Sequence, residues 1–455
     1  MKLPASVRER PGAPVLLAVL ALAAILVAGY LHSYSRVSPA DELQHLDYLD
    51  RAADFEIVSA GDRVQERAMR AQACRGLDAP FDAKQPDCDD ADLDPEEFQE
   101  DGYNTAYVHP PTYYLITGNL GRVVEVAPGI SSWVTAGRAV GALWLGLGLA
   151  LTWLLFAELA VPIWTRVPLL VIMASAPVTL FASATVTPDA TALAAGAGAL
   201  LAVVRWESRR ASWVWPAVAV GLAIACKATN AIGVLVAFAY LGIRFLQQRR
   251  EESEPTVASD ASAVDVTTRR DAHELARVVA GMLAGVAVVS VGWLAMARAA
   301  QEVDPATLPM LKRLHVDELE YDDVRADLTA GFTPLNGAYL PPFLRESGGV
   351  KTLNVWGNVV VGAGAVVGLA YSAARSRLRA ISIAALIVAF VAGPALVVAN
   401  YVLSDIYTPI PPRYALSLLP ALLVACAVPL ANRILFVAAS VFAAWAAGSV
   451  LLAMM

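Results

Sequence analysis

The chain has 455 residues, of which 57% are hydrophobic and 16% are charged, and its net charge is −7. Since soluble domains carry about a quarter charged residues, this composition excludes an ordinary soluble protein and indicates a polytopic membrane protein. The acidic residues gather between positions 41 and 101, and no basic patch accompanies them. We therefore expect the lipid bilayer, and no nucleic acid, as a partner.

Apolar runs rich in Ala, Val, Leu and Gly recur along the chain at lengths that cross a bilayer. The first run follows Lys2, Arg8 and Arg10 without a clear cleavage site, so we interpret it as a retained signal anchor. About eleven spans are expected, at roughly 14–31, 133–155, 167–184, 190–204, 213–225, 228–245, 275–297, 355–373, 381–402, 415–430 and 434–452. The spans near 190 and 213 are short, so one of them is open to being tilted, re-entrant or broken around Lys227.

Basic residues near the span ends predict the orientation in the membrane. They follow or precede alternate spans, at Lys2, Arg8 and Arg10, at Arg205, Arg209 and Arg210, at Arg244, Arg249, Arg250, Arg269 and Arg270, and at Arg375, Arg377 and Arg379. With these groups cytoplasmic, the N-terminus is cytoplasmic and the C-terminus is outside. The single domain 1–455 then has extracytoplasmic loops at 32–132 and 299–354. The polar stretch 247–274 is a predicted disordered cytoplasmic linker.

Directly after the first span, a cluster of polar residues begins the first outer loop. If this segment is helical, Asp41, His45 and Tyr48 share one face, and Glu42 adds a second carboxylate. A polar cluster at the membrane surface suits chemistry on a lipid head group. The simpler alternative is a solvated helix start whose acids lie near the positive end of the helix dipole.

Further along this loop, three features bear on its structure and function. Cys74 and Cys88 form a disulfide if the loop faces an oxidising compartment, or remain free thiols. The acid-rich stretch 87–97 lacks the spacing of an EF-hand and reads more simply as a solvated loop. The stretch 107–115 combines aromatic residues and paired prolines with His109, a residue that a simple interfacial belt does not require.

Other ionisable residues lie near the outer ends of later spans. Asp189 occupies a short turn, Lys227 separates two apolar runs and Arg413 precedes the tenth span. Ionisable residues near membrane depth are costly and are functional candidates, although an Asp after Thr-Pro also caps helices and a Lys near a span end also snorkels. Together they suit a carboxylate that accepts a proton and cations that neutralise a phosphate leaving group.

Five short motifs, in order, resemble those of the glycosyltransferase C superfamily, the membrane enzymes that use polyprenyl-phosphate-linked sugars. They are P-x-D-E-x-x-H-x-x-Y at 39–48, H-P-P-x-Y-Y at 109–114, T-P-D at 187–189, G-L-A-I-A-C-K at 221–227 and P-R-Y at 412–414 with a proline at 420. The resemblance implies an all-α fold of the glycosyltransferase C type, with a large first extracytoplasmic loop that carries short juxtamembrane helices.

The resemblance also implies roles for individual residues. Asp41, or alternatively Glu42, is the expected general base. Asp189 positions the acceptor or a divalent metal, and Lys227 and Arg413 hold the lipid phosphate. The remaining candidates for substrate binding are His45, Tyr48, His109 and Tyr414. Some members of the family use a divalent cation and others do not. The adjacent Asp-Glu pair here differs from a spaced Asp-x-Asp, so the cofactor stays open, with Asp41 and Asp189 as its candidate ligands.

The expected function is transfer of a hexose or pentose from a polyprenyl-phosphate donor to a hydroxyl of a cell-envelope glycan, lipid or protein. The reaction is expected outside the cytoplasm and with inversion at the anomeric carbon. A transporter or flippase of a lipid-linked glycan is the alternative from another class, and a non-catalytic membrane scaffold is a third. Release of free polyprenyl phosphate distinguishes an enzyme from a transporter, which moves intact substrate.

Overall fold

The computed structural model describes residues 12–78, 86–253, 271–301, 303–336 and 339–455, and in these ranges the chain is helical with only isolated β-bridges. Nine helices of this described part are long and apolar enough to cross a membrane, and the count is ten if the pair α6 (Ile163–Ser175) and α7 (Pro177–Ala184), bent by 61°, is one span. The prediction of an all-α polytopic membrane protein is confirmed, and the expected count of about eleven is approximate.

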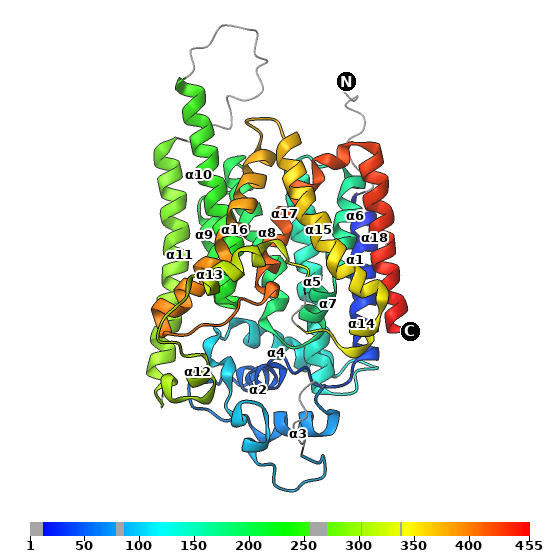
Figure 1. The fold of residues 1–455 in the computed structure, drawn as a ribbon, viewed down its shortest axis with the longest axis vertical. Coiled ribbons are helices and arrows are strands. Elements are labelled where there is room, and N and C mark those ends of the chain that lie inside the picture. Colours follow the sequence, from blue (N-terminus) through cyan, green and yellow to red (C-terminus); the bar gives the residue numbers. More distant parts are fainter. Residues whose placement is uncertain (1–11, 79–85, 254–270, 302, 337–338) are drawn as a thin grey trace.

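The long spans form one bundle (Figure 1). They are α1 (Gly12–Ser33), α5 (Trp133–Glu158), η4 (Pro188–Thr191) with α8 (Ala192–Glu207), η5 (Ala228–Asn230) with α10 (Ala231–Ser253), α11 (Ala272–Ala299), α15 (Gly348–Tyr371), α16 (Arg377–Ser404), η9 (Pro412–Leu418) with α17 (Leu419–Ala427) and η10 (Pro429–Ala431), and α18 (Arg433–Met454). The first described turn of α1 and the last turn of α18 lie at opposite ends of the bundle.

Helix α9 (Val214–Cys226) is the short element between two of these spans. Its 13 residues rise about 20 Å, whereas a hydrocarbon core is about 30 Å thick. The helix ends at Lys227, whose extended backbone (φ −163°, ψ 130°) leads into η5 and α10. Lys227 is 3% exposed and therefore lies inside the bundle, at the break between α9 and η5.

The loop at 32–132, here called the first outer loop after its expected side, contains short helices, as expected. They are α2 (Glu42–Ala53), α3 (Glu66–Arg75), η1 (Pro95–Glu97), η2 (Gln99–Gly102), η3 (Thr105–Val108) and α4 (Thr112–Glu125). Helix α4 packs on α5, and α2 packs on α4, so the loop forms a layer at one end of the bundle (Figure 1). A disulfide joins Cys74 and Cys88 within this layer.

The loop at 299–354, here called the later outer loop after its expected side, contains η7 (Pro305–Thr307), α12 (Pro309–Leu314), α13 (Tyr321–Ala326), η8 (Asp327–Phe332) and α14 (Pro342–Glu346). It does not stay at the surface, because η8 packs along the span α16. At the opposite end of the bundle, helices α10 and α11 extend into the predicted linker 247–274 from both sides. Residues 254–270 of that linker lie outside the described part of the chain.

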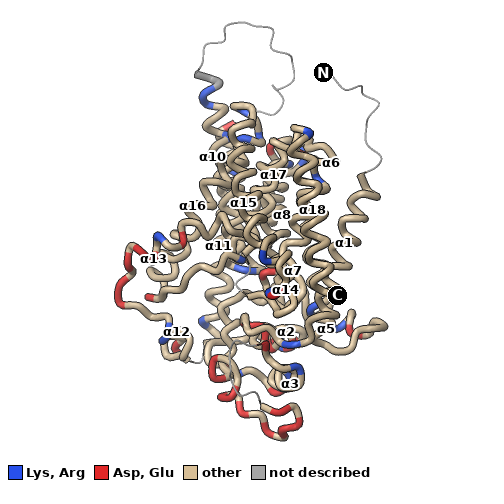
Figure 2. Tube along the Cα trace, turned by 45° about the vertical axis from the view of Figure 1, so that its right-hand side comes forward, with Lys and Arg blue, Asp and Glu red and all other residues tan. Residues whose placement is uncertain are grey.

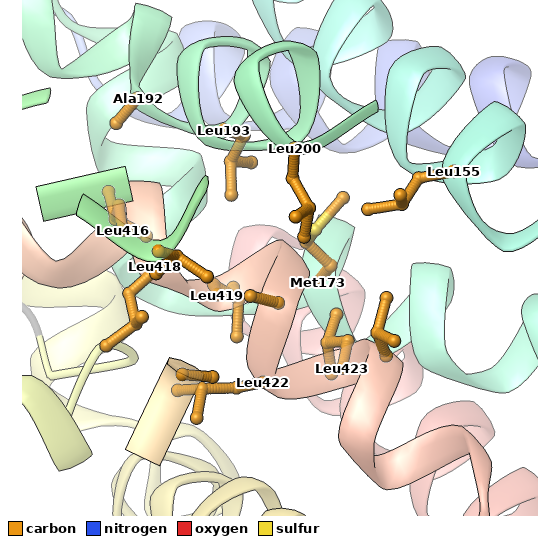
Figure 3. Close-up of a cluster of buried hydrophobic side chains, with 14 of the residues drawn as sticks. Leu155, Met173, Ala192, Leu193, Leu200, Leu416, Leu418, Leu419, Leu422 and Leu423 are labelled. Atoms are coloured by element: carbon orange, nitrogen blue, oxygen red, sulfur yellow. The ribbon is translucent and has the colours of Figure 1, made fainter. Parts of the chain in front are cut away.

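Helix α8 packs against η9 and α17 in the core of the bundle, where Leu193 and Leu200 of α8 point toward Leu419 (Figure 3). The backbones approach closely at Gly196, since a Cβ there would overlap the carbonyl oxygen of Ser417. Only glycine permits such a contact. This contact fixes η9 against α8 and thereby brings two chain segments, far apart in sequence, to the same place.

Candidate functional site

The central feature of the site is a buried carboxylate held by two cations. Asp189 Oδ1 lies 2.5 Å from Lys227 Nζ, and Asp189 Oδ2 lies 3.1 Å from Arg413 Nε. The side chains of Asp189 and Lys227 are only 2–3% exposed, and that of Arg413 is 13% exposed. Residues separated by 38 and 224 positions along the chain therefore meet at one point.

Local sequence explains why each of these side chains points to this place. The Thr187 hydroxyl caps η4 by accepting from the backbone N–H of Asp189 at 3.4 Å, and proline follows Thr187 at the first position of the turn. Helix α9 ends at Cys226, and the extended backbone of the next residue directs Lys227 into the bundle. Arg413 follows two prolines and lies in the first turn of η9.

Asp41 lies at the open side of this ion cluster. Its Oδ2 is 3.9 Å from Arg413 Nη2, and its side chain is 53% exposed. The residue precedes α2 in a left-handed conformation (φ 62°), which a non-glycine residue adopts at a cost of about 1–2 kcal/mol. Partial removal of the carboxylate from water raises the pKa of Asp41, and the positive charge of Arg413 opposes this shift. Asp41 is therefore an accessible carboxylate poised next to a cation.

Glu42, the adjacent acid, has a different environment. Its carboxylate forms a buried ion pair with Arg138, at 2.8 Å to Nε and 2.7 Å to Nη2, and both side chains are 1% exposed. It also accepts the backbone N–H groups of Ser38 at 2.8 Å and Val186 at 2.9 Å. These contacts tie the start of α2 to α5 and to the turn that leads to Asp189. Sequence reasoning missed Arg138, although a charge one turn inside an apolar span is a detectable signal.

The two predicted histidines lie together beside the cluster. The rings of His45 and His109 are 5.5 Å apart, and His45 Nδ1 is 2.8 Å from the Tyr114 hydroxyl. Tyr48 stacks on Tyr114 at 4.1 Å. Burial lowers the pKa of His45 well below its usual range and that of His109 to about 3, with Lys227 adding to the shift at both. Both rings are therefore neutral at physiological pH.

Two tyrosines complete the surroundings of the ions. The ring of Tyr414 lies 4.4 Å from Lys227 Nζ and 5.5 Å from the Arg413 guanidinium, so both cations contact its face. The Tyr113 hydroxyl accepts the backbone N–H of Thr187 at 3.1 Å and connects α4 to the Asp189 turn. All nine sequence-predicted site residues thus lie in or directly beside one region, with Glu42 turned toward Arg138.

A cavity of about 480 Å³, here called the lateral groove, begins next to this cluster and runs between α4, α5, α8 and α9. Thr112, Thr191 and Cys226 line its end near the ions, whereas Arg205 and Arg210 line its far end. Its walls include apolar side chains that are exposed on the outer surface of the bundle, among them Leu147, Val218 and Leu222. The groove therefore lies next to the ion cluster and is bounded in part by side chains on the outer surface of the bundle.

The donor set of the ion cluster does not fit a divalent cation. Both oxygens of Asp189 already contact cationic side chains. Over the described ranges of the chain, no group of three or more His, Cys, Asp and Glu side chains is placed to hold a metal ion. Lys227 and Arg413, by contrast, present N–H donors that suit an anionic ligand.

No protein-family model matches the chain, and no significant match to a curated protein is found. Among solved structures, the chain is similar to the crystal structure of ArnT from Cupriavidus metallidurans bound to undecaprenyl phosphate. The sequence identity is 15% and the TM-score is 0.47. The match covers 91% of this chain and 60% of that chain, so this chain spans about three-fifths of the length of ArnT.

Proposed function

We propose that this protein is a membrane glycosyltransferase of the glycosyltransferase C type that moves a sugar from a polyprenyl-phosphate donor to a hydroxyl of a cell-envelope acceptor. The acceptor is a glycan, a lipid or a protein, and the sugar is a hexose or a pentose. The observation that supports this most strongly is the convergence of Asp41, Asp189, Lys227 and Arg413 beside the end of the lateral groove that Thr191 and Cys226 line.

We infer the chemical class of the sugar donor from the position of Lys227 and Arg413 next to the apolar lateral groove. A ligand that fits both has an anionic head and a long apolar tail. The groove follows α8 from Thr191 to Arg205, which is about 21 Å at 1.5 Å per residue. A polyprenyl chain fills such a groove while its phosphate lies at Lys227 and Arg413. Undecaprenyl phosphate, the ligand named for the ArnT crystal structure, is a lipid of this class.

The proposed reaction is a single displacement. Asp41 accepts the proton of the acceptor hydroxyl as its oxygen attacks the anomeric carbon. The bond between that carbon and the phosphate oxygen breaks, and the electron pair leaves with the polyprenyl phosphate, whose charge Lys227 and Arg413 stabilise. One displacement inverts the anomeric centre. Glu42 is less suited to be the base, because four contacts already occupy its oxygens.

The site lies on the extracytoplasmic side in this proposal. The disulfide between Cys74 and Cys88 belongs to an oxidising compartment. Many Asp and Glu residues lie in the loops near α3 and α13, whereas Lys and Arg residues gather at the other end of the bundle, where α10 ends (Figure 2). By the positive-inside rule, this distribution supports a cytoplasmic N-terminus and an active site that faces outward.

The test is an Asp41→Asn variant assayed in proteoliposomes with a panel of polyprenyl-phosphate-linked hexoses and pentoses. The wild type should release free polyprenyl phosphate, and the variant should lose about 10²- to 10⁴-fold in rate, as expected for loss of a general base. Asp54→Asn is the matched control, because Asp54 is an exposed carboxylate at the end of the same helix. Undiminished release by Asp41→Asn would disprove the assignment.

A flippase or transporter of a lipid-linked glycan is the second candidate, and the length of the lateral groove favours it. The groove extends from Thr112 to Arg205 and Arg210 near the other end of the bundle. A transporter would deliver intact lipid-linked sugar to the opposite leaflet and release no polyprenyl phosphate. The same proteoliposomes distinguish the two functions.

A further inference from the structure

The later outer loop is joined to the segment that carries Arg413. Between the end of α12 and the end of α16, two backbone hydrogen bonds form a short antiparallel pair. The N–H of Val316 donates to Asp405 O at 3.0 Å, and the N–H of Tyr407 donates to Leu314 O at 2.9 Å. The chain that enters η9 is thus held from outside the bundle before it reaches the ion cluster.

Asp327 makes a second and deeper attachment to the same segment. Asp327 begins η8, is 5% exposed, and its Oδ1 accepts the backbone N–H of Ile410 at 3.0 Å. Only Pro411 and Pro412 separate Ile410 from Arg413. Proline fixes its own φ near −65°, so this connection has little freedom. The position of Ile410 therefore constrains the position of Arg413 and its guanidinium.

The platform under Asp327 is rigid. A Cβ at Gly331 would overlap the carbonyl oxygen of Ala389, and a Cβ at Gly393 would overlap that of Asp327. Glycine at both positions allows the backbones of η8 and α16 to touch. Phe332 also packs edge-to-face on Phe390 of α16, with 4.5 Å between ring centroids. Asp327 is thus fixed to a membrane span and not to a free loop.

The stability of the fold alone does not explain a carboxylate at position 327. Its Oδ2 is buried and has no hydrogen-bond partner within the described residues. A buried polar atom without a partner costs free energy, and such an atom in a native protein calls for an explanation. Because the Asp327 carboxylate is kept despite this unfavourable free energy, we infer that it serves to position the Ile410 amide that it binds.

We propose that Asp327 is a positioning residue, which fixes Arg413 for contact with the lipid phosphate by anchoring the amide of Ile410. This role rests on the proposed function, because it assumes that Arg413 binds the donor. It adds a residue from the later outer loop, with no direct contact to the ion cluster, to those that set the geometry of the site.

The experiment compares Asp327→Leu, which removes the acceptor and the unpartnered oxygen together, with Asp327→Asn, which keeps an acceptor oxygen of the same reach. The first readout is hydrogen exchange of residues 413–420 in the purified full-length protein. Asp327→Leu should speed exchange there several-fold, while Asp327→Asn should stay near wild type. Asp322→Ala is the control, because Asp322 is exposed on the neighbouring helix α13.

The second readout is kinetic. Loss of one hydrogen bond that orients Arg413 should lower kcat/KM for the polyprenyl-phosphate sugar about two- to tenfold, because Arg413 both binds the phosphate and stabilises it as the leaving group. In an Arg413→Ala background, Asp327→Leu should add no further change. Unchanged exchange in Asp327→Leu, or effects that multiply with those of Arg413→Ala, would overturn the proposal. If the wild type transfers no sugar, the proposed function fails, and the exchange result still decides whether Asp327 positions this segment.

Discussion

Lys227→Met removes one of the two cations that face the proposed phosphate. Lys227 has three N–H donors, one of which contacts Asp189 at 2.5 Å, so others remain for a ligand. A hydrogen bond to a charged group contributes about 1.5–3 kcal/mol, and each 1.4 kcal/mol is a tenfold change. The affinity for polyprenyl phosphate should therefore fall about 10- to 150-fold, as measured by binding of that lipid to the purified protein.

Stability has to be separated from binding in this variant. Breaking a buried ion pair costs about 3–5 kcal/mol, but Arg413 still neutralises Asp189, so the loss in unfolding free energy should be smaller. Adding Asp189→Asn should recover thermal stability without recovering lipid affinity. Lys312→Met, the same change at an exposed lysine, should alter neither. Wild-type affinity for polyprenyl phosphate in Lys227→Met would refute the assignment of Lys227 as a phosphate ligand.

Three further predictions concern the layer that supports the site. Arg138→Met leaves the buried Glu42 carboxylate without its cation, so the free energy of unfolding should fall by about 3–5 kcal/mol. A decrease in melting temperature no larger than that caused by replacing an exposed arginine with Met would contradict this. Cys74→Ser opens a link across 14 residues and should cost about 3 kcal/mol, with reductant destabilising the wild type but not a Cys74→Ser/Cys88→Ser double variant. Since burial lowers the pKa of His109 from 6.5 to about 3, the unfolded chain binds the extra proton between these values, so stability falls as pH drops below about 6.5. His109→Phe should flatten this part of the pH–stability curve, and an unchanged curve would contradict the shift.

The sequence was sufficient to predict that Asp189, Lys227 and Arg413 share a side of the membrane. Each lies near the outer end of an apolar run, and the basic residues at the other ends give a consistent orientation. Sidedness restricts such residues to a thin layer, so a meeting of distant positions becomes a reasonable expectation. Their contacts, however, depend on the close packing of Gly196 against Ser417, which no local pattern reveals.

Sequence reasoning could not separate Asp41 from Glu42. Asp41 precedes α2 in a left-handed conformation, whereas Glu42 is the first residue of the helix, so the two neighbouring side chains point in different directions. The choice depends on Arg138, whose position opposite α2 is a property of the tertiary fold. The same holds for Asp327, because the later outer loop shows no apolar periodicity that would predict its descent along α16.

The short helix α9 shows a more favourable case. The apolar run near 213 is too brief for an ordinary span, and the lysine after it suggests an interruption at membrane depth. The structure ends α9 at Cys226 and places Lys227 in the break. Run length and one charged residue indicated an irregular span here but left open whether it was tilted, re-entrant or broken, and the structure shows the break at Lys227.

The measurement that tests the central claim most directly is an experimental structure of this protein with a polyprenyl phosphate bound. The account predicts the phosphate within hydrogen-bond distance of Lys227 and Arg413, and the apolar chain in the lateral groove along α8. A phosphate bound instead at Arg205 and Arg210, at the far end of the groove, would contradict it.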